Sequence, residues 1–331
     1  MGYSVPELWF EKLSDWVGLP NWAGAICFGW APFLLLSLLP ALASAFPPPT
    51  VIFLNAFDLV FAVFAFQTAS YLRRELTRLL KFVDEIHGGL TGASTQLDLS
   101  HFSSARRVIL VYLVTLAFVV PLFTLGQTGI SLPVALEGEV PFFWFNFVFA
   151  TFLWTFGYSM YSIYKMGKLP LKLRPYTEDR TLGLRPFGKA SLNSTLIYVG
   201  VVSTVVIPVI FQGFLPLELS LAFLILYPVG FLLFLFPLLS MHSRLVDAKK
   251  QELAWIGPRA TVLLQRVKAS GNDQIDDRTA NEISVLDMLK REAQQIHTWP
   301  FDTGILARLL AVLLTVVGIL ISGIIRNLLH F

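Results

Sequence analysis

Long apolar runs that recur along the chain set the tightest limit on its fold. An α-helix needs about 20 apolar residues to cross the ~30 Å hydrocarbon core of a bilayer. Runs of this kind lie at 22–46, 51–71, 108–127, 141–164, 195–215, 219–241 and 304–325. Only 14% of the residues are charged, whereas soluble domains carry roughly 25%. The sequence therefore predicts an all-α, polytopic membrane helix bundle with about seven transmembrane helices.

Basic residues fall in alternate connections between these runs. The connections with six, seven and nine Lys or Arg residues are 72–107, 165–194 and 242–303. The connections with none are 46–50, 128–140 and 216–218. Because short cytoplasmic loops are enriched in Lys and Arg, this alternation puts 24 of the 25 basic residues on the cytoplasmic side. We expect a multi-pass membrane protein with its N-terminus inside and its C-terminus outside.

The connections divide the chain into three parts. Residues 1–241 are expected to form three transmembrane hairpins, and residues 304–331 a terminal transmembrane helix. Between them, 242–303 is expected to form a cytoplasmic helical hairpin. In that segment the helix leaving the membrane is predicted to stop at Gly257-Pro258, with a second helix beginning there. A capping box at Thr279–Glu282 then opens a helix whose apolar stripe ends at Ile296.

Two further cytoplasmic segments have recognisable patterns. Residues 72–86 continue the second membrane helix with an apolar stripe. The basic loop 165–194 is expected to lie against anionic headgroups.

The N-terminal segment is expected to form a helix on the membrane surface. In residues 5–17, Trp9, Leu13 and Trp16 share one helical face, as in interfacial helices. The alternative is a mobile polar N-terminus. Ala43-Ser44-Ala45 resembles a signal-peptidase site, but the acidic residues before it are unlike the positive start of a signal peptide.

Three prolines indicate a weak internal repeat. Pro40, Pro121 and Pro208 lie in similar apolar settings, 81 and 87 residues apart. Because Pro removes a backbone hydrogen bond and kinks helices, these positions are candidate hinges. The alternative is that Pro is simply common in membrane helices.

One acidic residue lies clearly inside an apolar run and defines a candidate intramembrane polar site. Asp58 follows Asn55 by three residues, and Asn146 in the fourth run is a possible partner, as are Gln127 and Gln212. An intramembrane carboxylate marks an ion path, a proton site or a buried partner. The alternative is a carboxyl group that only joins helices by hydrogen bonds.

Motifs for catalysis or cofactor binding are missing from the sequence. Residues 183–190 nearly match a phosphate-binding loop, but Ala190 replaces the Mg²⁺-binding hydroxyl and no strand precedes them. The five histidines lack ligand spacing, and Cys27 is the only cysteine. We expect no enzyme activity, no cofactor, no metal and no nucleic-acid partner.

The last part of the chain carries a resemblance. The stretch from His297, with Trp299-Pro300-Phe301-Asp302 before an apolar helix, resembles the ends of uncharacterised prokaryotic multi-pass membrane proteins. The resemblance covers about a tenth of the chain and implies a prokaryotic plasma-membrane setting, with no activity attached.

The favoured functional hypothesis is a non-catalytic, oligomeric ion channel or pore-like effector gated through the cytoplasmic hairpin. The candidate gating or coupling residues are Arg244, Lys249, Lys250, Trp299 and Arg308. Two alternatives stay open, a scaffold or sensor subunit that couples to a partner protein and a small-solute transporter. The expected partners are anionic lipid headgroups and, through 242–303, further copies of the chain or another protein.

Overall fold

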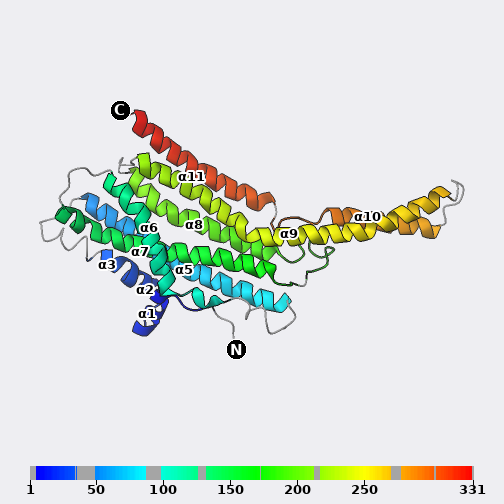
Figure 1. The fold of residues 1–331 in the computed structure, drawn as a ribbon, viewed down its shortest axis with the longest axis horizontal. Helices are drawn as coiled ribbons and strands as arrows, with labels where there is room; N and C mark the ends of the chain where they lie inside the picture. Colours follow the sequence, from blue (N-terminus) through cyan, green and yellow to red (C-terminus); the bar gives the residue numbers. More distant parts are fainter. Residues whose placement is uncertain are drawn as a thin grey trace.

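A computed structural model describes residues 5–33, 35, 49–86, 98–125, 132–171, 173–211, 217–269, 277–301 and 303–329. Over these ranges the chain is helical and contains no strand, so the all-α prediction is confirmed. The long helices are α5 (Pro49–Ile86), α6 (Ala105–Leu125), α7 (Leu132–Lys168), α8 (Arg185–Phe211), α9 (Leu217–Ala269) and α11 (Thr303–Leu329). They lie roughly side by side in a bundle, with α11 along one edge (Figure 1).

Aromatic side chains fill the bundle core. Phe61 of α5 stacks on Phe145 of α7 at a centroid distance of 4.2 Å. About three turns farther along α7, Phe156 stacks on Tyr198 of α8 at 4.8 Å. Offset ring stacking adds to the stabilisation from apolar burial. The aromatic-rich sequence thus holds α5, α7 and α8 together.

The N-terminal part packs on the bundle. It comprises α1 (Trp9–Val17), α2 (Asn21–Gly24), the π-helical turn η1 (Ala25–Trp30) and α3 (Ala31–Phe33). Trp16 is 84% exposed and Leu13 is exposed. Trp9 begins the same helical face but is only partly exposed. Its ring packs edge-on against Phe66 of α5, because the start of α1 lies on the bundle.

The stripe predicted for residues 72–86 is present. The stripe residues on α5 are all buried: Leu72, Leu76, Leu79 and Val83.

Two helix boundaries differ from the predictions. Helix α7 begins at Leu132, inside the expected connection 128–140, and α8 begins at Arg185, ahead of the expected start at 195.

Helix α9 is unbroken from Leu217 to Ala269. The predicted stop at Gly257-Pro258 was therefore wrong. A proline inside a helix removes one backbone hydrogen bond, but Ile256 beside it is fully buried, and α10 (Asp277–Gln294) packs along this part of α9. We call residues 242–269 and 277–294 the arm. It extends from the bundle along its long axis, with α10 folded back on α9 (Figure 1).

Two helices are long and apolar enough, among the side chains described, to cross a membrane. They are Arg185–Val206 and Tyr227–Ala269. The outer faces of other helices are also apolar: Leu110 of α6 is 60% exposed and Leu314 of α11 is 71% exposed.

Candidate functional site

The arm joins the bundle through a compact aromatic junction. The His242 ring of α9 stacks on Trp299 at 4.2 Å, with 23° between the planes. Its Nδ1 lies 2.6 Å from the carbonyl oxygen of Thr298. Phe301 continues the cluster and packs on Phe234 of α9 at 5.5 Å. The candidate coupling residue Trp299 therefore lies in the contact between α9 and the segment that leads to α11.

Gly188 allows this junction to close. A Cβ atom at Gly188 would lie 2.0 Å from the carbonyl oxygen of Pro300, a distance that no side chain tolerates. The segment that nearly matches a phosphate-binding loop thus contains the first turns of α8, and its second glycine is a packing position.

Two predicted coupling cations cap helix ends. Lys249 Nζ lies 2.5 Å from the carbonyl oxygen of Gln294 and 3.1 Å from that of Ile296, at the end of α10. Arg244 Nη2 donates to the carbonyl oxygen of Lys168, the last residue of α7, at 2.7 Å. Cations stabilise helix C-termini because the last carbonyls lack intrahelical partners. Lys249 therefore joins the two helices of the arm, and Arg244 joins the arm to α7.

The other two coupling candidates, Lys250 and Arg308, have exposed side chains. Lys250 lies on the arm, and Arg308 lies in the second turn of α11.

The loop between α7 and α8 packs beneath the arm. His297 N donates to the carbonyl oxygen of Arg180 at 3.0 Å. Asp179 organises the loop, because its carboxylate accepts hydrogen bonds from Thr181 N and Gly183 N at 2.9 and 3.0 Å. Burial alone raises the pKa of Asp179, but these hydrogen bonds and the Thr181 hydroxyl outweigh it and lower the pKa.

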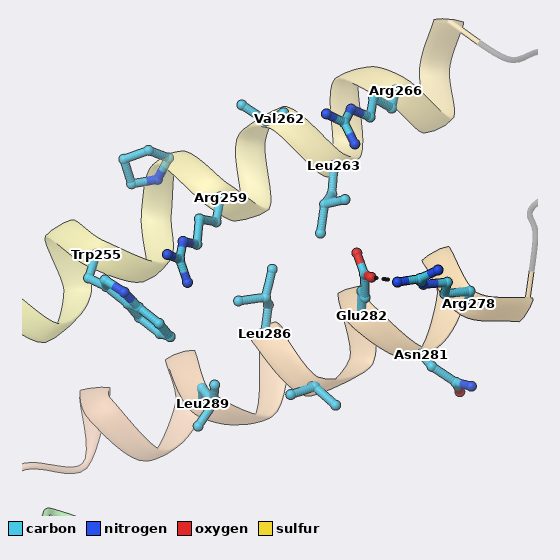
Figure 2. Close-up of a pocket in the computed structure, with 12 residues that line it drawn as sticks. Trp255, Arg259, Val262, Leu263, Arg266, Arg278, Asn281, Glu282, Leu286 and Leu289 are labelled. Carbon is cyan, nitrogen blue, oxygen red and sulfur yellow. Dashed lines mark ion pairs between the residues drawn. The ribbon is translucent and has the colours of Figure 1, made fainter.

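A groove of about 950 Å³ lies between the two helices of the arm. Leu263 of α9 and Leu286 of α10 point into it from opposite sides (Figure 2). Val262 and Val285 also line it and are exposed. The predicted stripe of α10 runs from this groove into the core, where Ile296 is 2% exposed. The arm thus presents an apolar surface that its own residues leave open.

The groove has a positive rim. Three arginines, Arg259, Arg266 and Arg278, line it together with one acidic residue, Glu282. Arg278 Nε lies 3.6 Å from Glu282 Oε1, and the Arg259 guanidinium lies 4.6 Å from the Trp255 ring centroid. The described lining therefore carries two positive charges in excess.

The intramembrane polar candidates are on neighbouring helices but are not joined. Asp58 on α5 is partly buried, and Asn146 on α7 is 3% exposed. Among the described residues no hydrogen bond joins them, and Asn146 Nδ2 has no partner there. The Asn55 side chain, Gln127 and Gln212 lie outside the described residues.

The candidate hinges are only partly covered by the structure. Pro40 lies outside the described residues, whereas Pro121 and Pro208 lie within the continuous helices α6 and α8. A hinge role for them stays a prediction.

The sequence did not reveal a buried ion pair between the N-terminal segment and α5. Glu11 is 1% exposed, and its Oε2 lies 3.0 Å from Arg73 Nε. The same oxygen accepts a hydrogen bond from Leu8 N at 2.8 Å. A Glu three residues after a helix start is a capping signal, but its long-range partner has no local signature.

Comparison of the chain with protein-family models, curated proteins and solved structures found no match. Among the described residues, no group of three or more His, Cys, Asp or Glu side chains is placed to hold a metal ion.

Proposed function

We propose that this chain is a multi-pass membrane protein that acts without catalysis as a coupling subunit. Its bundle lies in the plasma membrane, and its cytoplasmic arm binds an acidic, amphipathic helix of a partner protein. The observation that carries this proposal is the unbroken course of α9 from the bundle core into the arm. Any partner on the arm is thereby connected to the bundle by one continuous helix.

Exposed apolar side chains support the membrane setting. Soluble monomers rarely expose large contiguous apolar patches, yet leucines on α6, α9 and α11 are 60 to 71% exposed. Contacts support a topology in which the basic connections lie on one side of the membrane. The basic connections meet at one end of the bundle, where Tyr158 donates to the Asp98 carbonyl oxygen, Asn193 to Tyr71 and Arg244 to the Lys168 carbonyl oxygen.

Charge complementarity identifies the partner. An amphipathic helix docks in a groove through apolar residues spaced along one face. Leu263, Val285 and Leu286 offer that apolar floor, and the excess of arginine on the rim attracts carboxylates. A second copy of the arm would bring its own excess of positive charge against this rim, so a different, acidic partner fits better.

The test is site-specific photo-crosslinking of the full-length protein in its native membrane. A photoreactive amino acid at Val262 or Val285 should capture a partner through an acidic helical segment, identified by mass spectrometry of the crosslinked peptide. Capture should fall at least about tenfold in Arg259→Glu/Arg266→Glu, because like charges now meet. Lys268→Glu/Lys290→Glu changes the same charge elsewhere on the arm and should leave capture unchanged.

Two outcomes would contradict this proposal. Crosslinks to a second copy of the chain would make the arm a site of self-association. Equal loss of capture in both charge-reversal variants would show a general charge effect and no groove recognition.

Asp58 favours a second candidate, an oligomeric ion channel gated through the same arm. It is partly exposed on an apolar helix, so copies of the bundle could place it beside a shared path. Purified protein in liposomes should then conduct ions, and Asp58→Asn should change the conductance or ion selectivity. Absence of flux at all voltages and pH values tested would exclude the channel.

A further inference from the structure

A cavity of about 340 Å³ lies where α7 ends and α9 leaves the bundle. Tyr164 and Lys168 of α7 and Ser243 and Arg244 of α9 line it. The apolar runs of these helices end at 164 and 241. In the membrane topology proposed above, on which this inference rests, the cavity therefore lies at the level of the cytoplasmic headgroups.

Two cations are held at this cavity by defined contacts. Lys168 Nζ lies 4.5 Å from the centroid of the Tyr164 ring, a cation–π contact. Arg244 Nη2 donates to the Lys168 carbonyl oxygen at 2.7 Å, and a guanidinium has further N–H donors. The described residues that line the cavity include no acidic side chain. The positive charge of Lys168 and Arg244 is therefore not compensated by an acidic residue among the described residues that line the cavity.

The walls of the cavity are tightly packed. Ser240 Oγ donates to the Tyr164 carbonyl oxygen at 3.0 Å, which ties α9 to α7. A Cβ atom at Gly167 would lie 2.1 Å from the Ser240 hydroxyl oxygen, so the two helices touch beside the cavity. Both cations are thus carried on a rigid frame, which reduces the entropy lost when a ligand binds.

We propose that Lys168 and Arg244 make this cavity a binding site for a phosphate group, carried by the headgroup of an anionic membrane lipid. Arginine binds phosphate through paired N–H donors, and lysine adds a point charge. The Ser243 hydroxyl donates to the Ser240 carbonyl oxygen at 3.0 Å, so recognition of the phosphate falls to the two cations. Basic pockets between membrane helices on the cytoplasmic side suit anionic headgroups.

The test measures ligand binding to the purified full-length protein in neutral detergent by native mass spectrometry. The probes are phosphatidylglycerol, phosphatidylcholine and inorganic phosphate. Phosphatidylglycerol should bind on the order of tenfold more tightly than phosphatidylcholine, and Lys168→Gln/Arg244→Gln should abolish the difference. Lys165→Gln/Lys250→Gln removes two cations from the same helices outside the cavity. This variant should retain the preference for phosphatidylglycerol.

Arg244 also caps α7, so Lys168→Gln alone is the safer variant. Lys168 is exposed, and its loss should still weaken phosphatidylglycerol binding several-fold without changing the helical content. Inorganic phosphate binding that is equally strong and is lost in the same variants would support the anion site and assign it to free phosphate. An unchanged lipid preference in the double variant would overturn the proposal.

Failure of this proposal can be told apart from failure of the membrane topology. If alkaline carbonate extracts the chain from membranes, the membrane setting itself is wrong. If the chain stays in the membrane but shows no preference for anionic lipid, the phosphate site alone is wrong.

Discussion

At the scale of single residues, the described structure depends on polar contacts that join distant parts of the chain. The Glu11–Arg73 pair fixes α1 on α5, and Asp179 gathers three donor groups in the loop under the arm. Removing one member of a buried ion pair leaves an uncompensated charge, which costs more than the pair contributes. These residues therefore offer sharp tests of the packing.

Glu11→Gln should lower the free energy of unfolding by about 2–4 kcal/mol, because Arg73 would lose its charged partner. Arg73→Met should have a similar effect, and the double variant should be less unstable than the two effects added together. Reversible denaturation in mixed micelles measures each value. Glu7→Gln is the matched control at an exposed position of the same segment, and an equal loss there would contradict the role of the pair.

The loop around Asp179 should loosen in acid. Its pKa is lowered in the folded protein, so its contribution to stability is present above the ordinary value near 3.8. That contribution is lost as the pH falls through the folded pKa. Hydrogen exchange of residues 173–184 should therefore accelerate below about pH 4. Asp179→Asn should already exchange fast at pH 7 and should lose most of this pH dependence.

At the scale of elements, local signals predicted helices well and their ends poorly. The stripes of α5 and α10 were predicted from spacing alone, since apolar residues every three or four positions must share a face. The stop at Gly257-Pro258 was wrong because burial of Ile256 and packing of α10 along α9 outweigh one lost hydrogen bond. The groove could not be predicted, because it depends on how far the two helices of the arm stand apart.

Glycine substitutions test the junction between α8 and the segment that leads to α11. Gly188→Ala should destabilise the protein by about 1–3 kcal/mol, because the new methyl group meets a backbone carbonyl that cannot move cheaply. Gly157→Ala in α7 has open space around the new Cβ and should be neutral or stabilising by about 0.5–1 kcal/mol. Thermal unfolding in detergent compares the two, and equal stabilities would contradict the close approach.

At the scale of the whole molecule, composition predicted the helical class, and contacts place the basic connections at one end of the bundle. The relative placement of the helices could not be predicted. It depends on pairs such as Phe61–Phe145 and Phe156–Tyr198, and in a chain with this many aromatic residues many other pairings are equally plausible from sequence. The same holds for the partly buried Asp58. Its position along an apolar helix follows from the sequence, but the side chains that surround it do not.

Cysteine labelling tests the orientation. Cys27 is the only cysteine and is exposed, so Cys27→Ser gives a clean background. In right-side-out vesicles a membrane-impermeant maleimide should label Glu137→Cys and Glu218→Cys. Thr177→Cys and Lys250→Cys should react only after permeabilisation. Labelling of both pairs in intact vesicles would show that the proposed topology is wrong.

The uninterrupted course of α9 has a mechanical consequence. Residues 242–269 form a lever about 40 Å long, at about 1.5 Å per residue. A tilt of about 5° at its base would move its tip by about 3–4 Å, the width of one helical side-chain contact. His242 and Trp299 pack at that base. A small rearrangement of the bundle there would therefore shift the groove and change its affinity for a partner.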